Sequence, residues 1–567
     1  MKKNITIIQI FLFILAHHLA KGQDLERLPD QKPITFNGSL TVGTNFYNSW
    51  GIANRRQPFF WNITGAPVVT LYGITFPFSF VISEQERRFS QPFNQYGVSP
   101  YYKWITVHAG YRNVKFSDYT LAGANFLGGG VELNPKWLRF GFIYGRFSRA
   151  VQEDSLAMGS FGYIRPTYKR MGYAAKLGFG SKSKFVDLVF FKAWDDVTSI
   201  DSVSSKSKIK PEENIAIGLK SHLAFFKNRL NFDLDIGGSF LTRDTRQASI
   251  LDSASIPLAK FLDRFATVNA SSGFYKAINT SLGYSFGLGN VRGVYKRIDP
   301  GYRSLGAYYF QNDMEQFTIA PSLNLWQGKV SVNLSFGGGR DNLNDTRYAT
   351  TVRKIYSANV NIVATDRLNI NLDYGNFGTS QNQGVGDLFN DSTALKVVNA
   401  NYGAVVSYRI SPKSGLSHQF TLSSNYQNTN DLNRFTEAYT NANTFIGSLN
   451  YNLSWPSQKI NASAGVAYNN TAVYNGKIIN VSPNLSLTKM FLNNKLRTTL
   501  SESIQFRKSE GQGDGLTSNT SIAAGYTFKR HTVSLNSGYL TNRYKAGIGP
   551  YPNFSEFRTN LSYSIRF

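Results

Sequence analysis

The last eight residues of the chain alternate strictly between polar and apolar side chains. The apolar positions, which share one face of an extended segment, are Leu561, Tyr563, Ile565 and Phe567. The polar positions between them are Asn560, Ser562, Ser564 and Arg566. A period of two predicts a β-strand whose two faces meet different surroundings. The chain therefore ends in a strand with one oily face and one wet face.

The same pattern recurs upstream in runs that are long for a strand. Clear examples cover residues 34–46, 215–225 and 445–455, where apolar side chains alternate with Ser, Asn, Thr, Gly or Lys. Each run reaches about ten residues, the length that a tilted strand needs to cross a bilayer. No stretch after the N-terminus approaches the roughly 20 apolar residues of a membrane helix. The pattern favours membrane-crossing strands.

These runs predict an all-β fold, a single transmembrane antiparallel β-barrel of about 24 strands within a range of 20 to 26. About 17 of the strands come from residue 215 onward, where the alternation is clean. The earlier strands are expected near 34–47, 67–82, 101–116, 124–133, 137–147, 171–180 and 184–194.

The connections alternate between tight turns and longer polar loops. Tight turns rich in Gly, Pro, Asn and Asp are expected near residues 227–228, 289–290, 327–328, 366, 412–415, 456–457, 493–494 and 529–530. Longer loops are expected near 243–274, 299–315, 377–394, 428–440, 508–514 and 544–553. In bacterial barrels the short turns face the periplasm and the longer loops are extracellular.

The N-terminus has the features of a secretory signal peptide. Lys2 and Lys3 precede an apolar run from Ile5 to Ala16, and Ala20-Lys21-Gly22 offers a small-residue cleavage site. Residues 1–22 are therefore expected to be removed on export, leaving 23–33 as a short periplasmic segment before a barrel at 34–567. A retained membrane anchor is the alternative, which the shortness of the apolar run disfavours.

The charge balance bears on partners. The formal net charge is +26, and it becomes +23 once Lys2, Lys3 and Lys21 leave with the signal peptide. No block of consecutive like charges occurs, so the excess is spread along strands and loops. This spread favours a positive lumen or anionic lipid over nucleic acid. The absence of Cys excludes disulfides and thiolate metal sites.

Two segments depart from the regular pattern. Residues 83–100 are long and rich in charge and aromatics, yet strand parity assigns them to the short-turn side. They predict a periplasmic insert or a partial plug, unless a strand boundary is misplaced. In the extracellular loop 243–274, apolar residues recur at roughly helical spacing. Such a helix packs either into the barrel mouth, narrowing it, or on neighbouring loops. Its apolar residues are Ile256, Leu258, Phe261, Leu262 and Phe265.

Residues that carry chemistry are sparse, so we expect no enzyme, no catalytic or metal site and no cofactor. The mature chain has four histidines, none at metal-ligand spacing: His108, His222, His418 and His531. His418 lies near Ser417 and Ser423, but its alternation with Phe420 marks an ordinary strand end. No phosphate-binding Gly-rich loop occurs.

The lumen is the better place to seek function, because charges on the lipid face are costly and basic residues should point inward. A basic lining would favour anions. Alternatively, these cations pair with inward carboxylates such as Asp233 and Asp235, or bind lipopolysaccharide near the rims. The candidate lumen residues are Lys220, His222, Arg292, Lys296, Arg353, Arg409 and Arg497.

The chain from residue 23 onward resembles outer-membrane β-barrels of Gram-negative bacteria, through its signal peptide, amphipathic hairpins and C-terminal strand. The resemblance implies that Tyr563, Ile565 and Phe567 form the signal that the barrel-assembly machinery reads. The Asn-, Tyr- and Lys-rich style, with cleavage just before Gln23, is similar to that of Bacteroidota envelope proteins. TonB-dependent transporters carry an N-terminal plug domain, for which no room exists before Ile34. General diffusion porins and fatty-acid transporters have fewer strands.

The sequence thus predicts a protein of the outer membrane that contacts its lipid and lipopolysaccharide. The first functional hypothesis is a channel or transporter for hydrophilic solutes, anionic or saccharide, through a basic lumen. The alternative is a non-conducting scaffold or component of a secretion, gliding or surface-polysaccharide system, with periplasmic or surface protein partners. The sequence names no solute.

Overall fold

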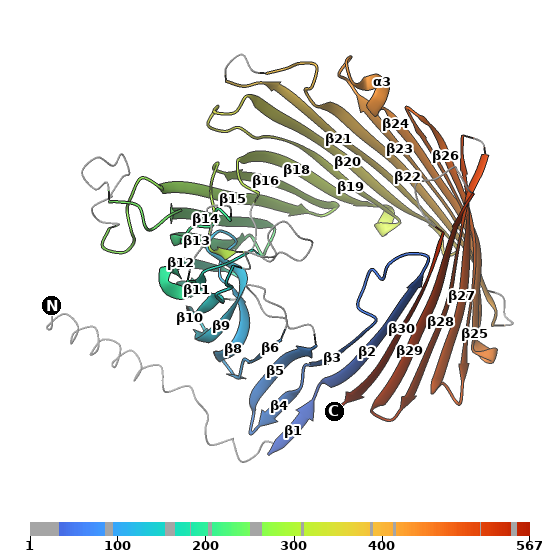
Figure 1. Cartoon of the computed structure of the whole chain (residues 1–567), viewed down its shortest axis with the longest axis horizontal. Helices are drawn as coiled ribbons and strands as arrows, with labels where there is room; N and C mark the ends of the chain where they lie inside the picture. The colour runs from blue at the N-terminus through green and yellow to red at the C-terminus, as the bar shows by residue number, and fades with distance from the viewer. Residues whose placement is uncertain are drawn as a thin grey trace.

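The wall of the molecule is one continuous antiparallel sheet that closes on itself (Figure 1). The computed structural model describes residues 33–84, 94–153, 165–181, 183–201, 207–249, 263–307, 311–385, 389–411, 415–510, 512–545 and 553–567. In the described residues no helix combines the length and hydropathy needed to cross a bilayer.

The sheet contains 30 strand segments, which make 26 wall positions in a closed barrel. Three positions are each built from two short segments, β1 with β2, β3 with β4 and β6 with β7, while β17 lies apart from the wall. The first segments are β1 (Ile34–Asn37), β2 (Ser39–Trp50), β3 (Phe59–Gly65), β4 (Val68–Leu71), β5 (Ile74–Ser83), β6 (Gln95–Val98), β7 (Tyr101–Tyr102), β8 (Ile105–Lys115), β9 (Leu121–Leu133), β10 (Leu138–Ser148), β11 (Lys169–Gly180) and β12 (Phe185–Asp196).

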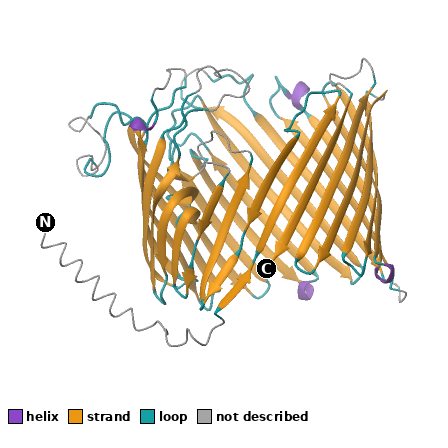
Figure 2. Ribbon diagram, turned by 60° about the horizontal axis from the view of Figure 1, so that its bottom comes forward, coloured by secondary structure: helices purple, strands orange, loops and turns teal. Residues whose placement is uncertain are grey.

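The rest of the chain continues the wall as a meander in which each strand pairs with the next, except that β17 pairs with β9 and the wall passes directly from β16 to β18 (Figure 2). These strands are β13 (Glu213–Phe225), β14 (Leu230–Thr242), β15 (Ser272–Phe286), β16 (Gly289–Ile298), β17 (Gly306–Ala307), β18 (Met314–Leu325), β19 (Val330–Arg340), β20 (Ala349–Thr365), β21 (Leu368–Gln383), β22 (Lys396–Ile410), β23 (Ser417–Asp431), β24 (Ala442–Trp455), β25 (Ile460–Val473), β26 (Gly476–Phe491), β27 (Leu496–Ser509), β28 (Gln512–Phe528), β29 (His531–Tyr544) and β30 (Phe554–Arg566). Short helical pieces lie in connections: η4 (Val197–Ser199), η5 (Trp326–Gly328), α3 (Glu437–Thr440) and η6 (Pro456–Gln458).

The barrel closes where the two ends of the chain meet. Strand β2 pairs antiparallel with β30, from Ser39 opposite Arg566 to Trp50 opposite Ser555. The backbone N–H of Phe567 also donates to the carbonyl of Gly38 at 3.1 Å. Closure leaves no unpaired strand edge, which is what a sheet surrounded by lipid requires.

The first two wall positions are kinked at the same height. Gly38 separates β1 from β2 with a φ of 116°, and a Cβ there would lie 2.4 Å from the carbonyl oxygen of Ala66. Opposite it, Ala66 and Pro67 separate β3 from β4, and Pro67 has no N–H to give to a ladder. Only Gly tolerates this close approach and this backbone conformation.

The expected strand count was two short, within its range. The 17 strands expected from residue 215 onward are present, but residues 59–115 contain more strands than the alternation indicated. The expected strand at 67–82 is the hairpin of β4 and β5 around Tyr72-Gly73, and β3 precedes it. The expected strand at 101–116 is β7, a turn at Lys103-Trp104 and β8. Neither turn contains the Pro or Asn that usually reveals a turn.

This difference also corrects the placement of residues 83–100. With the additional strands, the connection from β5 to β6 lies at the barrel end that carries the longer loops, not at the short-turn end. Gln95–Val98 is wall strand β6 rather than part of an insert. Residues 85–93 lie outside the described residues, so the plug hypothesis has no structural description.

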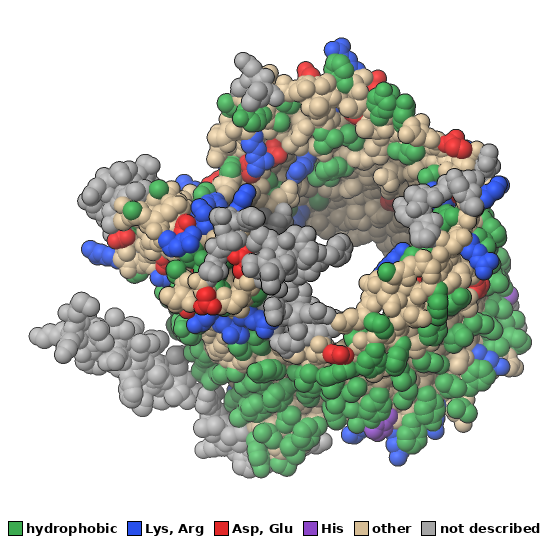
Figure 3. Space-filling view, in the orientation of Figure 1, with side chains coloured by type: hydrophobic (Ala, Val, Ile, Leu, Met, Phe, Trp, Pro, Cys, Tyr) green, Lys and Arg blue, Asp and Glu red, His purple; other side chains and the backbone are tan. Residues whose placement is uncertain are grey.

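The outward face is mainly apolar, and Figure 3 shows hydrophobic side chains gathered on the part of the outer wall that lies below the opening. Aliphatic side chains such as Leu188, Leu449 and Leu485 are about half exposed or more in mid-strand positions. Aromatic rings gather towards the strand ends, and at the short-turn end two histidines join them. His418 Nδ1 lies 2.8 Å from the Tyr451 hydroxyl, and His531 Nδ1 lies 2.6 Å from that of Tyr563. This arrangement matches a lipid-facing band edged by interfacial rings.

One outward carboxylate departs from this apolar surface. Glu502 on β27 lies opposite Leu485, whose side chain is 63% exposed on the outer face. Its carboxylate accepts hydrogen bonds from the hydroxyls of Ser518 at 2.7 Å and Thr520 at 2.5 Å. The two hydroxyls give the carboxylate oxygens hydrogen bonds that lipid could not provide.

From β19 to β30 the inward face is polar, and the described side chains bond to each other along it. Pairs of hydroxyls meet across neighbouring strands, including Ser423 with Ser448 at 2.7 Å and Ser501 with Ser521 at 2.6 Å. Amides do the same, with Asn560 donating to Asn45 at 2.9 Å. The space-filling view shows an opening bordered by this side of the barrel (Figure 3).

One added charge should lower the free energy of unfolding much more on the outward face than on the inward face. Leu449→Arg on β24 should lower the free energy of unfolding by about 2–4 kcal/mol, because the new charge faces lipid. Asn450→Arg, its inward neighbour, should cost much less because its charge faces the interior. Urea unfolding in phospholipid vesicles measures both. Equal losses for the two variants would contradict the assigned faces.

Candidate functional site

Two connections at the loop end fold into the barrel instead of leaving it. They are the β8–β9 turn, residues 116–120, and the first half of the β16–β18 connection, residues 299–307, which we call the inner loops (Figure 1). Within the second, β17 pairs in parallel with β9, so that Gly306 lies opposite Leu121. The inner loops therefore fill part of the lumen on the side of β8–β16.

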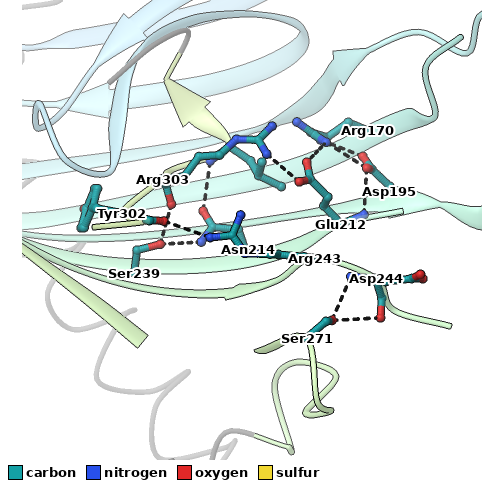
Figure 4. A network of polar contacts seen from close by, with 12 residues as sticks. Arg170, Asp195, Glu212, Asn214, Ser239, Arg243, Asp244, Ser271, Tyr302 and Arg303 are labelled. Atoms are coloured by element: carbon teal, nitrogen blue, oxygen red, sulfur yellow. Dashed lines mark hydrogen bonds and ion pairs between the residues drawn. The ribbon is translucent and has the colours of Figure 1, made fainter. Parts of the chain in front are cut away.

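The longer inner loop is held to the wall by hydrogen bonds from Asn214 and Ser239. Asn214 on β13 donates to Ser239 Oγ at 2.8 Å and accepts from the Leu305 N–H at 3.1 Å. Ser239 on β14 donates to the carbonyl of Arg303 at 2.6 Å (Figure 4). Both wall side chains are completely buried, and buried polar groups need such partners.

The shorter inner loop is bound to the same wall and to the longer loop. The Ser117 hydroxyl and the Asp118 N–H donate to the two carboxylate oxygens of Asp235 at 2.6 and 2.9 Å. The Tyr302 hydroxyl donates to the Tyr119 carbonyl at 2.5 Å. Burial raises the pKa of both the Tyr119 and Tyr302 hydroxyls above the ordinary tyrosine value, so these groups stay protonated donors.

Small wall residues leave room for the loops. A Cβ at Gly237 on β14 would lie 2.4 Å from Tyr119 Cβ and 2.5 Å from the Tyr302 hydroxyl. An apolar core continues this contact between wall and loops, and its buried members come from β8 to β14 and from both inner loops. They are Val114, Phe116, Leu121, Ala124, Phe126, Ile143, Phe147, Ala174, Val189, Phe191, Ala193, Ala216, Leu241 and Leu305.

A charged network lies above this core at the loop end (Figure 4). Arg170 on β11 makes a two-pronged pair with Asp195 on β12, at 2.7 and 2.9 Å. One carboxylate oxygen of Glu212 accepts a hydrogen bond from the Arg170 guanidinium at 3.1 Å. The other oxygen accepts one from the guanidinium of Arg303, in the longer inner loop, at 2.5 Å. The Asp195 side chain is 3% exposed, so its pair with Arg170 is largely desolvated, whereas the pair of Glu212 with Arg303 is more open to solvent. Together these pairs hold the strand ends and the loop in one arrangement.

The network forms part of the lining of a cavity of about 730 Å³, which we call the mouth cavity. It lies among the strand ends of β11 and β12, the segments 165–168 and 208–212, and the longer inner loop. Its lining includes apolar residues such as Phe147 and Leu305, and its cationic side chains are Arg165, Arg170, Lys208, Lys210, Arg243 and Arg303.

Three of the residues expected to face the lumen lie together in a second cavity of about 460 Å³. His222 Nδ1 lies 2.5 Å from one oxygen of Asp233, and Arg292 approaches the other at 3.3 Å. Lys220 lies opposite Asp235 in the β13–β14 register and lines the same cavity. His222 and Arg292 thus pair with Asp233, one of the arrangements that the sequence left open, whereas Lys220 lies opposite Asp235 without a direct ion pair to it in the described residues.

The other candidates do not join them. Lys296, Arg353, Arg409 and Arg497 lie on β16, β20, β22 and β27, and within the described ranges none has an ion pair. They occupy positions between the outward residues of their strands. The seven candidates therefore form one paired cluster and several separate cations, not a ring.

Neither histidine chemistry nor a metal centre emerges in the described part of the chain. His418 and His531 contact tyrosines on the outer face. His108 lies between Ser99 Oγ at 2.9 Å and Glu132 at 3.3 Å, beside Lys176, which pairs with the same carboxylate. The described residues contain no group of three His, Cys, Asp or Glu side chains that could hold a metal.

The described residues of the connection from β14 to β15, 243–249 and 263–271, do not decide between the two packings predicted for its apolar stripe. Residues 263–271 lie against the outward face, where Val268 and Ala266 pack on Ile215 and Phe240. The Thr267 N–H donates to Glu213 at 2.9 Å. Residues 250–262, which include most of the apolar stripe, lie outside the described residues. The described segment covers wall rather than narrowing the mouth.

Sequence reasoning did not identify the mouth cavity. Its charged residues come from loops and strand ends far apart in the chain, such as the ion pair of Glu212 with Arg303, which are 91 positions apart. A signal was present in the clustering of basic residues near 165–170, 208–210 and 297–303. Only the register of the strands and the inward turn of the loops bring them together.

Comparisons with known proteins give fold-level likeness only. No protein-family model and no curated protein matches the chain. Among solved structures, OccAB2 of Acinetobacter baumannii is similar over 63% of this chain and 93% of its own, with 10% identity and a TM-score of 0.31. The PapC translocation pore of the P pilus usher is similar over 94% of this chain and 100% of its own, with 9% identity and a TM-score of 0.38. A PapC-PapD-PapK-PapG assembly intermediate of the E. coli P pilus tip is similar over 93% of this chain and 60% of its own, with 10% identity and a TM-score of 0.44. At these values the likenesses carry no argument about function.

The attachment of the longer inner loop predicts a local effect of one amide. Asn214→Ala removes the acceptor of the Leu305 N–H and a donor to Ser239, at a cost of about 1–3 kcal/mol for groups left buried without partners. Hydrogen exchange in a peptide covering 301–307 should become faster by roughly tenfold or more. Asn452→Ala on the opposite wall is the control and should leave that peptide unchanged. Unchanged exchange in Asn214→Ala would refute the attachment.

Proposed function

We propose that this protein is an outer-membrane channel for hydrophilic solutes with a preference for anions. The observation that carries the proposal is the contrast between the two sides of the wall. The outer face is mainly apolar in its middle, whereas the inner face of β19–β30 carries hydroxyls and amides beside an opening (Figure 3). A polar lumen inside an apolar cylinder suits passage of water-borne solutes.

The inner cations support the choice of anions. Arg353, Arg409 and Arg497 face the interior without an ion pair in the described ranges, and six cations line the mouth cavity. Unpaired positive charge along a pore attracts anions and lowers their barrier. The paired cluster of His222, Arg292 and Asp233 contributes less, because its charges largely cancel.

The proposal includes the orientation and the route of the chain. Residues 1–22 direct export and are removed, the short turns face the periplasm, and the longer loops face outward. Tyr563, Ile565 and Phe567 lie on the lipid-facing side of β30 and serve the barrel-assembly machinery as the closing strand. Lipopolysaccharide and outer-membrane lipid surround the wall. A Bacteroidota source remains part of this proposal.

A planar bilayer measurement tests the proposal. In a KCl gradient the wild-type protein should conduct with a reversal potential that indicates anion preference. Replacing Arg353, Arg409 and Arg497 together by Ala should move the reversal potential towards the non-selective value. Lys354→Ala, the outward neighbour of Arg353, is the matched control and should leave it unchanged.

Two outcomes would count against the proposal. Clear cation preference of the wild type would refute the anionic selectivity. A folded protein that inserts but never conducts would refute the channel and favour the scaffold alternative, in which the wall and loops serve partner proteins.

A further inference from the structure

The mouth cavity contains more positive charge than the structure neutralises. Six cationic side chains line it, against the two carboxylates Asp195 and Glu212. Both carboxylates are fully engaged by Arg170 and Arg303. The remaining four cations therefore face the cavity without a carboxylate of its lining to pair with.

Each of these four has little other compensation. In the described part of the chain, Arg165 and Lys208 have no ion pair. Lys210 lies 3.8 Å from Asp244, but Arg246 already holds both oxygens of that carboxylate at 2.9 and 3.1 Å. Hydrogen bonds from Arg246 keep the pKa of Asp244 below its usual range, so it stays ionised but occupied.

Arg243 is oriented rather than neutralised. Its guanidinium donates to the Tyr275 hydroxyl and to the Gly301 carbonyl, both at 3.4 Å, and its carbon lies 5.8 Å from the Tyr275 ring centre. These weak contacts aim it beside the longer inner loop, where Gly301 lines the cavity. Like charges that converge in a partly enclosed space repel one another, unless an anion lies between them.

The rest of the cavity suits an organic molecule. Its apolar lining includes Phe147, Tyr302 and Leu305, which are buried members of the cores beneath the inner loops. Its volume of about 730 Å³ falls in the range typical of sites for small organic ligands. The apolar residues and the cations of this lining together favour an anion with a carbon body over an inorganic ion.

We infer that the mouth cavity binds a small organic solute carrying two or more carboxylate, phosphate or sulfate groups. The anionic groups contact the four cations that no carboxylate of the lining pairs with, which are Arg165, Lys208, Lys210 and Arg243. The apolar side chains of the lining contact the carbon body of the solute. The Arg170–Asp195–Glu212–Arg303 network holds the strand ends and the loop that shape the site. That the bound solute then passes into the lumen rests on the proposed channel function, whereas the binding itself does not.

Binding to purified protein in detergent, measured by isothermal titration calorimetry at low salt, tests the site. The probes are citrate and glucose 6-phosphate, with glucose as the neutral comparison. The wild type should bind both anions saturably and should not bind glucose. Low salt is used because exposed charges are screened within about 10 Å at 0.1 M. Removing lipopolysaccharide beforehand excludes its phosphates as the occupant.

Variants localise the binding. Arg165, Lys208 and Arg243 replaced together by Ala should weaken binding of both anions by about tenfold or more, because three counter-charges are lost. Arg165→Lys with Lys208→Arg keeps the charge and should retain binding within a few-fold. Lys396→Ala with Arg434→Ala removes loop-end cations that do not line the cavity, and this control should bind as the wild type does. Heat-modifiable gel mobility confirms that each variant is folded.

The outcomes separate this inference from the channel proposal. No saturable binding of either anion by the folded wild type, or binding that the triple variant retains in full, overturns the site. Anion binding without conductance supports the site and removes the channel function. Conductance without anion binding supports the channel function and overturns the binding site.

Discussion

The structure depends on one requirement, that every backbone N–H and C=O group in the wall finds a partner on a neighbouring strand because lipid offers none. The sheet meets it only by closing, and closure happens between strands from the two ends of the chain, β2 and β30. Side-chain alternation follows from the same geometry, since successive residues of each strand face lipid and interior in turn. Fold, orientation of side chains and the choice of interior residues all derive from this closure.

A barrel of 26 strands encloses more space than wall side chains can fill, and among the described residues the inner loops fill it on the side of β8–β16. Along β8–β16 small residues such as Gly218 and Gly237 admit the inner loops, which carry their own apolar core. Along β19–β30 the interior carries hydroxyls and amides instead. The division gives a rigid half that shapes the mouth cavity and a polar half that borders the opening. Binding and passage can therefore reside in one wall without a separate plug domain.

The sequence predicted most of the fold because nearly every strand from residue 215 onward alternates between apolar side chains that face lipid and polar side chains that face water. It failed near residues 59–115, where Pro67 and Pro100 interrupt strands, the turn at Tyr72-Gly73 has Gly as its sole usual turn residue, and the turn at Lys103-Trp104 has none. The inner loops were beyond its reach, since period-2 alternation describes a strand's faces and not the direction in which a connection folds. The inward positions of Lys220, His222 and Arg292 followed from alternation, but their approach to Asp233 and Asp235 required the register.

The central claim is that the polar face of the wall meets water inside a lipid-embedded cylinder, and cysteine labelling along β24 tests it most directly. The chain has no Cys, so single substitutions for Ser448, Leu449, Asn450 and Tyr451 give unambiguous signals. With the protein in vesicles, a charged thiol reagent should modify the cysteines at 448 and 450 rapidly and those at 449 and 451 hardly at all. Equal reaction at all four positions, or none at 448 and 450, would contradict a water-filled interior.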